Sequence, residues 1–179
     1  MARISIKGLE AAVREVKRAQ KRLQDTVTDA IGEVIDLMIE EARKNAPKDI
    51  GNLIDSISKE RKDAWTMVFF VGEAHGAFQE FGLAGLRNVQ TNLVIPEEME
   101  EIAREFKSYK GGDFKTFVKE IEAWCGRKGI DPEAAYPIAV KILNYGLEAR
   151  PYFYPAYQKY KPEIIKRVNQ RLQEMFNGK

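Results

Sequence analysis

The amino-acid sequence predicts an α+β fold in which a long N-terminal helix and a C-terminal helix pack on a small antiparallel sheet, with a helical insertion. Two observations predict the helices and a third predicts the sheet. Apolar residues recur in steps of three and four over residues 9–42 and again over 153–175, and a short segment at 65–72 is rich in β-branched and aromatic side chains. The chain has 179 residues, of which 44% are hydrophobic and 31% charged, so it can bury one core.

The first helix is expected to run from about Gly8 to Asn45, and Pro47 supplies the stop because proline lacks the N–H that a helix interior needs. The charge of this helix changes sign along its length. Residues 1–24 carry seven basic and two acidic side chains, a charge of +5, whereas residues 25–45 carry six acidic and two basic ones, a charge of −4. A positive N-terminal half opposes the helix dipole, so we expect an oppositely charged surface on a partner.

The sheet is expected after this helix. Gly51 can adopt the positive φ that turns the chain back. Residues 57–62 are expected to pair with 65–72 as a hairpin, and the apolar segment 74–81 ends abruptly at Gly82.

The next segment is again helical in pattern. Pro96, which acidic residues follow, is typical of a helix start, and Gly111-Gly112 is expected to be a turn. A second helical face runs from Phe114 to Cys125, and a third helix starts at Asp131-Pro132-Glu133 and ends near Gly146.

These patterns predict a division of the chain. We expect residues 1–82 and 147–179 to form the α+β core and residues 83–146 to be a helical insertion into it.

The last helix carries an aromatic cluster at its start. Its apolar positions are Phe153, Tyr157, Tyr160, Ile164, Val168, Leu172 and Met175, and Pro162 is a candidate kink. Pro151 and Pro155 fix backbone angles on both sides of the cluster, so we expect its rings to enter the fold or a neighbour at a set angle.

Several classes of protein are excluded by simple counts. The longest stretches without a charge have nine residues, whereas a membrane-spanning helix needs about twenty apolar ones. We therefore expect no membrane span, and we expect no secretory signal and a chain made in the cytoplasm. The single cysteine, Cys125, can form no internal disulfide.

The residues also give little support to an enzyme. His75 is the only histidine, and its surroundings match no metal-binding helix motif. Cys125 shares an apolar helix face with Ile121 and Trp124, where a small buried side chain is the better interpretation. We expect no catalytic residues, no cofactor and no bound metal.

A nucleic-acid-binding module is the serious alternative. Five aromatic residues lie within nine positions near three cations, and such a cluster can stack bases: Tyr152, Phe153, Tyr154, Tyr157 and Tyr160, near Arg150, Lys159 and Lys161. The aromatic residues fit a core or a protein interface better. The basic helix face of Arg14, Lys17, Arg18 and Lys21 could touch phosphates, but a net charge of only +2 favours a solvated or subunit-facing surface.

Three segments of the sequence carry a family resemblance when they are taken in order after the long helix. They are Ala46-Pro47 with Ile50-Gly51-Asn52-Leu53 and Ser56-Ile57; Val71-Gly72 with Phe78-Gln79-Glu80-Phe81-Gly82; and Arg150-Pro151-Tyr152-Phe153-Tyr154-Pro155-Ala156. Together they resemble the head–tail joining, or tail-completion, proteins of long-tailed bacteriophages. Ile50 stands where that family usually has Thr, and Tyr152 precedes the Phe that usually follows the proline directly.

The resemblance implies a structural role in virion assembly. Copies of the chain would form a ring, hexameric in the particle, between the connector and the tail tube, with DNA passing through it without sequence recognition. A chain without these partners could be monomeric. The protein would be located in the host cytoplasm during assembly and in the virion neck or tail afterwards. A tail-completion protein and a neighbouring neck protein both fit.

The expected contact residues come from the first helix and the aromatic cluster: Arg14, Lys17, Arg18, Lys21, Tyr152, Phe153, Tyr154 and Tyr157. The residues expected to shape the subunit are Pro47, Gly51, Gly82, Pro151 and Pro155.

Overall fold

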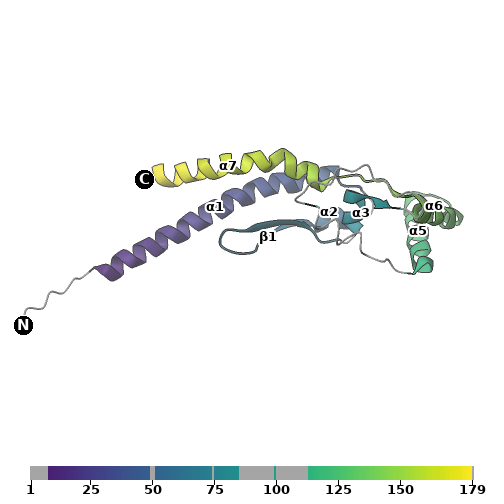
Figure 1. Ribbon diagram of the computed structural model, residues 1–179, viewed down its shortest axis with the longest axis horizontal. Coiled ribbons are helices and arrows are strands. Elements are labelled where there is room, and N and C mark those ends of the chain that lie inside the picture. Colours follow the sequence, from purple (N-terminus) through teal and green to yellow (C-terminus); the bar gives the residue numbers. More distant parts are fainter. Residues whose placement is uncertain (1–7, 49–50, 74, 85–98, 100–112, 179) are drawn as a thin grey trace, which may run out of the picture. The chain divides into compact units, whose positions relative to one another are not determined.

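The computed structural model describes residues 8–48, 51–73, 75–84, 99 and 113–178, and it confirms the α+β class (Figure 1). The helices are α1 (Leu9–Asn45), α2 (Asn52–Ser56), α3 (His75–Phe81), α5 (Phe114–Lys128), α6 (Ala135–Tyr145) and α7 (Phe153–Asn177), with a 3-10 turn at Pro132–Ala134. The strands are β1 (Ile57–Arg61), β2 (Met67–Val71), β3 (Leu83–Ala84) and β4 (Gly146–Leu147).

The chain divides into two compact units. Unit 1 comprises Met1–Glu41, Ser58–Phe70 and Ala156–Lys179, and unit 2 comprises Ala42–Ile57 and Val71–Pro155. These bounds differ from those of the predicted core and 83–146 insertion, and that division stays a prediction.

Unit 1 is built on an antiparallel pair of helices, α1 and α7 (Figure 1). Three contacts fix the direction, because the residue number falls along α1 as it rises along α7. Lys159 pairs with Glu41 at 2.9 Å, Arg171 pairs with Glu33, and the Thr26 hydroxyl donates to the Met175 sulfur at 3.4 Å. The buried stripe of α1 in this unit includes Ala30, Val34 and Met38.

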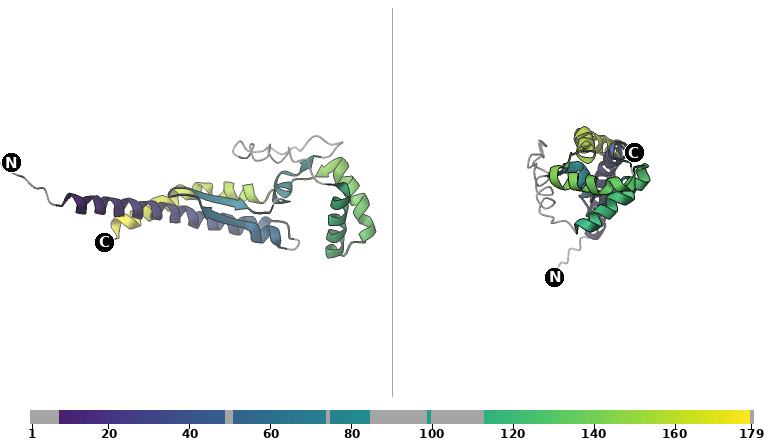
Figure 2. Two further views of the ribbon diagram at one scale, coloured as in Figure 1. Left: turned by 90° about the horizontal axis from the view of Figure 1, so that it is seen from below. Right: turned by 90° about the vertical axis from the view of Figure 1, so that its right-hand side faces the viewer.

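The hairpin of β1 and β2 lies along α1, which Figure 2 shows from a second direction. The Lys59 ammonium donates to the Gly32 carbonyl oxygen at 2.9 Å. At the hairpin end, the buried Thr28 hydroxyl lies 2.7 Å from the Gln24 carbonyl oxygen and 2.9 Å from that of Ala64. The hairpin predicted from 57–62 and 65–72 is thus confirmed, and it is held to α1 from the middle of β1 and from its turn.

Unit 2 contains the short helices. Asp113 caps α5 by accepting a hydrogen bond from the Thr116 N–H at 3.2 Å, and Gly129 ends the helix with φ +67°. Cys125 of α5 is fully buried, as are Ala135 and Ala139 of α6, so the small side chains of α5 and α6 lie in the core. Short side chains of this kind allow two helix backbones to approach closely.

Most predicted helix ends agree with the structure. The first helix begins at Leu9 and ends at Asn45, two residues before Pro47. The helix predicted from Asp131 starts with the 3-10 turn and ends at Gly146, whose φ is +79°. α7 continues through Pro162. The helix start predicted at Pro96 and the turn at Gly111-Gly112 lie outside the described residues.

At Gly82, two backbone segments of unit 2 lie close together. The φ of Gly82 is +71°, and β3 pairs with β4 directly after it, with Leu83 opposite Leu147. A Cβ on Gly82 would lie 2.6 Å from the Leu147 carbonyl oxygen and 2.9 Å from the Ala149 nitrogen, both of them backbone atoms. Glycine is therefore required here both by its backbone conformation and by space.

We predict that Gly82→Ala lowers the free energy of unfolding by about 2 kcal/mol or more. The new Cβ would overlap the backbone atoms of Leu147 and Ala149, and alanine would also be strained at a positive φ. The control is Gly126→Ala, since Gly126 lies inside α5 with open space around it. That change should raise stability by about 0.5–1 kcal/mol through helix propensity. Urea unfolding followed by circular dichroism measures both, and equal midpoints for Gly82→Ala and wild type would contradict the assignment.

Candidate functional site

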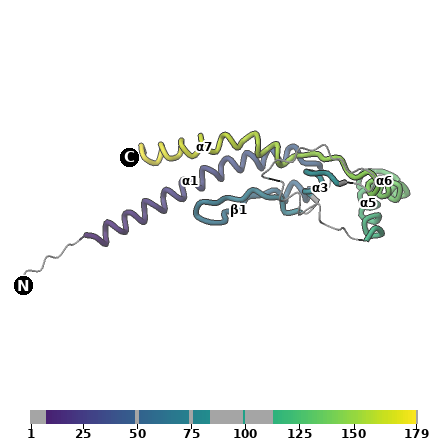
Figure 3. The backbone as a smooth tube through the Cα atoms, viewed as in Figure 1, coloured from purple at the N-terminus to yellow at the C-terminus, as the bar shows by residue number. Residues whose placement is uncertain are grey.

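The N-terminal part of α1 is exposed on every side. All residues from Leu9 to Arg22, which we call the exposed segment, are solvent-accessible, and Figure 3 shows α1 continuing past the C-terminal end of α7. Among the hydrogen bonds and ion pairs of the described residues, those that join α1 to other elements begin at Asp25, which pairs with Arg61, and at Thr26, which contacts Met175. Three large apolar residues of the exposed segment therefore face solvent: Leu9 is 70% exposed, Val13 45% and Val16 67%.

The exposed segment has two opposite faces. At 3.6 residues per turn, the five basic residues at steps of three and four share one face: Arg14, Lys17, Arg18, Lys21 and Arg22. The apolar residues occupy the other face. The structure therefore brings together the four predicted basic contact residues and adds Arg22, which the spacing alone would have revealed.

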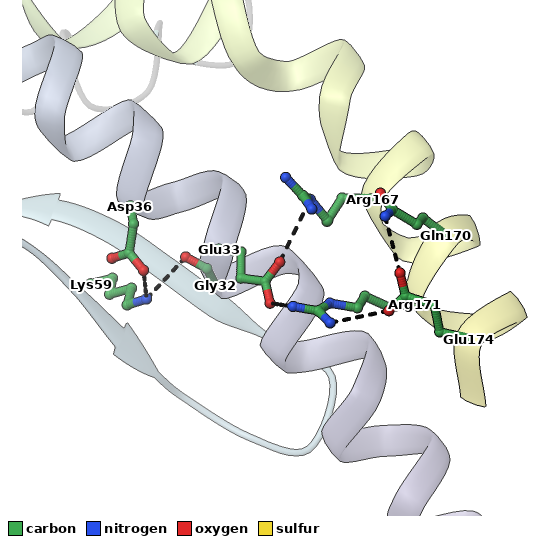
Figure 4. A network of polar contacts seen from close by, with 8 residues as sticks. All are labelled: Gly32, Glu33, Asp36, Lys59, Arg167, Gln170, Arg171 and Glu174. Carbon is green, nitrogen blue, oxygen red and sulfur yellow. Dashed lines mark hydrogen bonds and ion pairs between the residues drawn. The ribbon is translucent and has the colours of Figure 1, made fainter. Parts of the chain in front are cut away.

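The acidic half of α1 has a different environment, because its charges are paired within the chain (Figure 4). Asp36 pairs with Lys59 at 2.6 Å, and Glu33 accepts from Arg171 and lies 3.6 Å from Arg167. The Glu33 and Glu174 carboxylates raise the pKa of the Arg171 guanidinium. Nearer the N-terminus of α1, Asp25 pairs with Arg61 at 3.1 Å.

The pairing of Glu41 with Lys159 completes this series, and the hydrogen bond that the Lys159 ammonium donates to the Glu41 carboxylate raises the pKa of Lys159. Four of the six acidic residues of this half therefore meet a cation from the hairpin or from α7. The acidic half of the sign change along α1 therefore has an internal cause, because most of its carboxylates pair with cations of the same chain.

A second feature, in unit 2, is the buried carboxylate of Glu80. Glu80 is 4% exposed, and it accepts three backbone hydrogen bonds, from Tyr152 at 2.8 Å and from Phe153 and Tyr154 at 2.9 Å. These N–H groups lie at the start of α7, where no preceding helical carbonyl can satisfy them. Pro155 follows and has no N–H, so a single carboxylate satisfies the first turn and meets the positive end of the helix dipole.

The structure corrects the expectation that Tyr152 contacts a partner. Its side chain is 1% exposed and belongs to the core, so it is not offered to a partner or to a base. The space for its hydroxyl comes from Gly76, where a Cβ would lie 2.7 Å from that oxygen. Burial and the Glu80 charge raise the pKa of the Tyr152 phenol.

The other aromatic residues are half-buried. Phe153 and Tyr154 follow Tyr152 into α7, and the Lys161 ammonium lies 5.2 Å from the centre of the Tyr157 ring.

The two residues considered for catalysis lie on different helices. His75 begins α3, and Cys125 is a free, buried thiol. Among the described residues, no group of three or more His, Cys, Asp or Glu side chains could hold a metal ion. No helix in the described ranges is long and apolar enough to cross a bilayer.

Comparisons with known protein families, with curated proteins and with solved structures found no match to this chain. The resemblance to the tail-completion family therefore stays a prediction that rests on the three motif segments.

We predict that Glu80→Gln lowers the free energy of unfolding by about 2–4 kcal/mol. Glutamine has the same size, but its NH₂ group would replace one accepting oxygen and face backbone N–H donors, and the negative charge at the helix start would be lost. Glu148→Gln is the control, since Glu148 is exposed in the same unit and should change stability by under about 0.5 kcal/mol. Indistinguishable unfolding curves for the two variants would refute the capping role.

The raised pKa of Tyr152 predicts a loss of stability at alkaline pH. An unfolded tyrosine ionises near pH 10, whereas the folded one holds its proton, so the contribution is complete below pH 10 and is lost as the pH rises through the folded pKa. Tyr152→Phe should flatten the fall in unfolding free energy above pH 10. The control is Tyr145→Phe, because Tyr145 is exposed. The slope of the unfolding free energy against pH above about pH 10 is measured for both variants, and equal slopes for Tyr152→Phe and Tyr145→Phe would contradict the prediction.

Proposed function

We propose that this chain is a structural subunit of virion assembly, which completes the head–tail junction or the tail end of a long-tailed bacteriophage by forming a ring between connector and tail tube. The observation that carries the proposal is the exposed segment of α1, whose apolar face has no cover in the described chain. The role is structural and involves no catalysis or cofactor.

The apolar face of the exposed segment continues the buried stripe of α1. Leu9 and Val16 lie in seven-residue steps with Leu23 and Ala30, and Ala30 is fully buried. Since seven residues are close to two turns, all four share one face. An apolar stripe that continues with the same spacing into an exposed part of a helix is typical of a helix that another subunit covers.

Charge favours a head-to-tail contact over a symmetric one. Two copies that paired through the exposed segment would bring like charges together, which destabilises a pair. The segment would instead contact a different surface of its neighbour, and contacts of this heterologous kind form a ring when the rotation from one subunit to the next closes.

The motifs behind the resemblance form one connected structure in unit 2. The Gly72 N–H donates to the Ser56 carbonyl oxygen at 3.0 Å, and the Arg150 N–H donates to the Gln79 carbonyl oxygen at 2.7 Å. Glu80 adds the three hydrogen bonds at the start of α7. Segments more than seventy residues apart in sequence thus depend on one another, which supports their interpretation as one module.

The proposal is tested by mixing the chain with the phage connector and tail-tube proteins and following assembly by light scattering and electron microscopy. We predict rings with wild type and a loss of at least tenfold in ring yield with Leu9→Ser/Val16→Ser. The control is Ile165→Ser/Phe176→Ser on α7, where the two apolar residues are 70% and 68% exposed and therefore match the 70% and 67% of Leu9 and Val16.

A wild-type chain that stays monomeric with both partner proteins present would overturn the assembly role. Rings formed equally by both double variants would overturn the contact assigned to the exposed segment.

A further inference from the structure

The basic face of the exposed segment is a continuous strip of cations. Arg14 and Arg22 mark its ends, eight residues or about 12 Å apart along the helix axis. The five side chains on this face are all exposed, and the acidic residues nearest to it are Glu10, one turn before Arg14, and Glu15 at its edge. Only Arg18 uses one of them, in an exposed pair with Glu15 at 3.0 Å.

The strip is not neutralised elsewhere in the part of the chain that the structure describes. Arg14, Lys17, Lys21 and Arg22 have no hydrogen bond or ion pair there, whereas the acidic half of α1 is largely paired with the hairpin and α7. The small net charge of the chain therefore hides a difference between two regions: the acidic half of α1 is largely neutralised by its partners, whereas the strip stays positive. It says little about what the strip attracts.

We propose that this strip binds the phosphate backbone of double-stranded DNA without reading its sequence. A row of flexible, fully hydrated cations matches a linear polyanion, because each phosphate contact releases a counterion and needs no fixed geometry. The contact is a property of the isolated chain, so it does not rest on the assembly role.

Two other occupants fit the observations less well. A second copy of the segment would carry the same charge and repel it. An anionic membrane surface favours helices with large apolar side chains such as Trp, Phe and Leu, whereas the opposite face here contains Leu9, Val13, Val16 and otherwise small alanines. DNA needs only the basic face.

The test is fluorescence anisotropy of a labelled mixed-sequence duplex titrated with the full chain at salt concentrations between about 50 and 200 mM. We expect binding that weakens with salt, with a slope of log K against log salt of about −3, as for roughly three phosphate contacts. Arg14→Gln/Lys17→Gln/Lys21→Gln should weaken binding at least tenfold at the lowest salt and bring the slope close to zero.

Two control variants separate a local strip from overall charge. Lys115→Gln/Lys119→Gln/Lys141→Gln removes the same charge from exposed positions on α5 and α6 and should bind as wild type does. Lys17→Arg/Lys21→Arg keeps the charge and should also retain binding. Circular dichroism verifies that each variant is folded, which is expected because all the positions are exposed.

Three results would overturn the proposal. They are the absence of duplex binding by wild type at the lowest salt, an equal loss in the α5/α6 variant, and tighter binding to phosphatidylserine-containing vesicles than to the duplex, with the vesicle binding lost in the α1 variant. Failure of ring formation in the assembly experiment leaves this measurement unaffected, so the two proposals fail separately.

Discussion

The antiparallel packing of α7 along the C-terminal half of α1 is the constraint on which the candidate site depends. It covers the apolar stripe of α1 up to Thr26 and supplies the cations that pair with Glu33 and Glu41. Exposed ion pairs contribute little to stability one at a time, so packing of the stripe provides most of the stabilisation, and the charges fix register. Because the pairing ends at Thr26, the segment before it is left with an apolar face and a basic face in solvent.

The start of α7 is held by a different kind of interaction. Glu80 is a buried carboxylate whose charge is balanced by N–H donors and a helix dipole, without a cation in the contacts described. An arrangement of this kind is sensitive to geometry, since each N–H must aim at one of two oxygens. Gly76 and Gly82 provide the close approaches around it, so a few small residues determine where the last helix begins.

Periodicity and stop signals were sufficient to predict the long helix, the hairpin, α5 and α6 from the sequence. They could not predict which stretch of a stripe is covered: Leu9 and Ala30 occupy equivalent positions, yet one is 70% exposed and the other fully buried. Coverage depends on where α7 ends, which is a long-range property. For the same reason, periodicity did not decide between core and interface for Tyr152 and gave no sign of the capping role of Glu80, because the burial of both is set by partners more than seventy residues away in the sequence.

Hydrogen exchange measured residue by residue tests most directly the central claim, that residues 9–22 are uncovered in the free chain and become covered on assembly. The account predicts fast exchange of these amides in the isolated protein, slow exchange in the buried stripe around Val34, and strong protection of both after assembly with connector and tail-tube proteins. Equally slow exchange of both regions in the isolated chain, or no gain of protection at residues 9–22 on assembly, would contradict it.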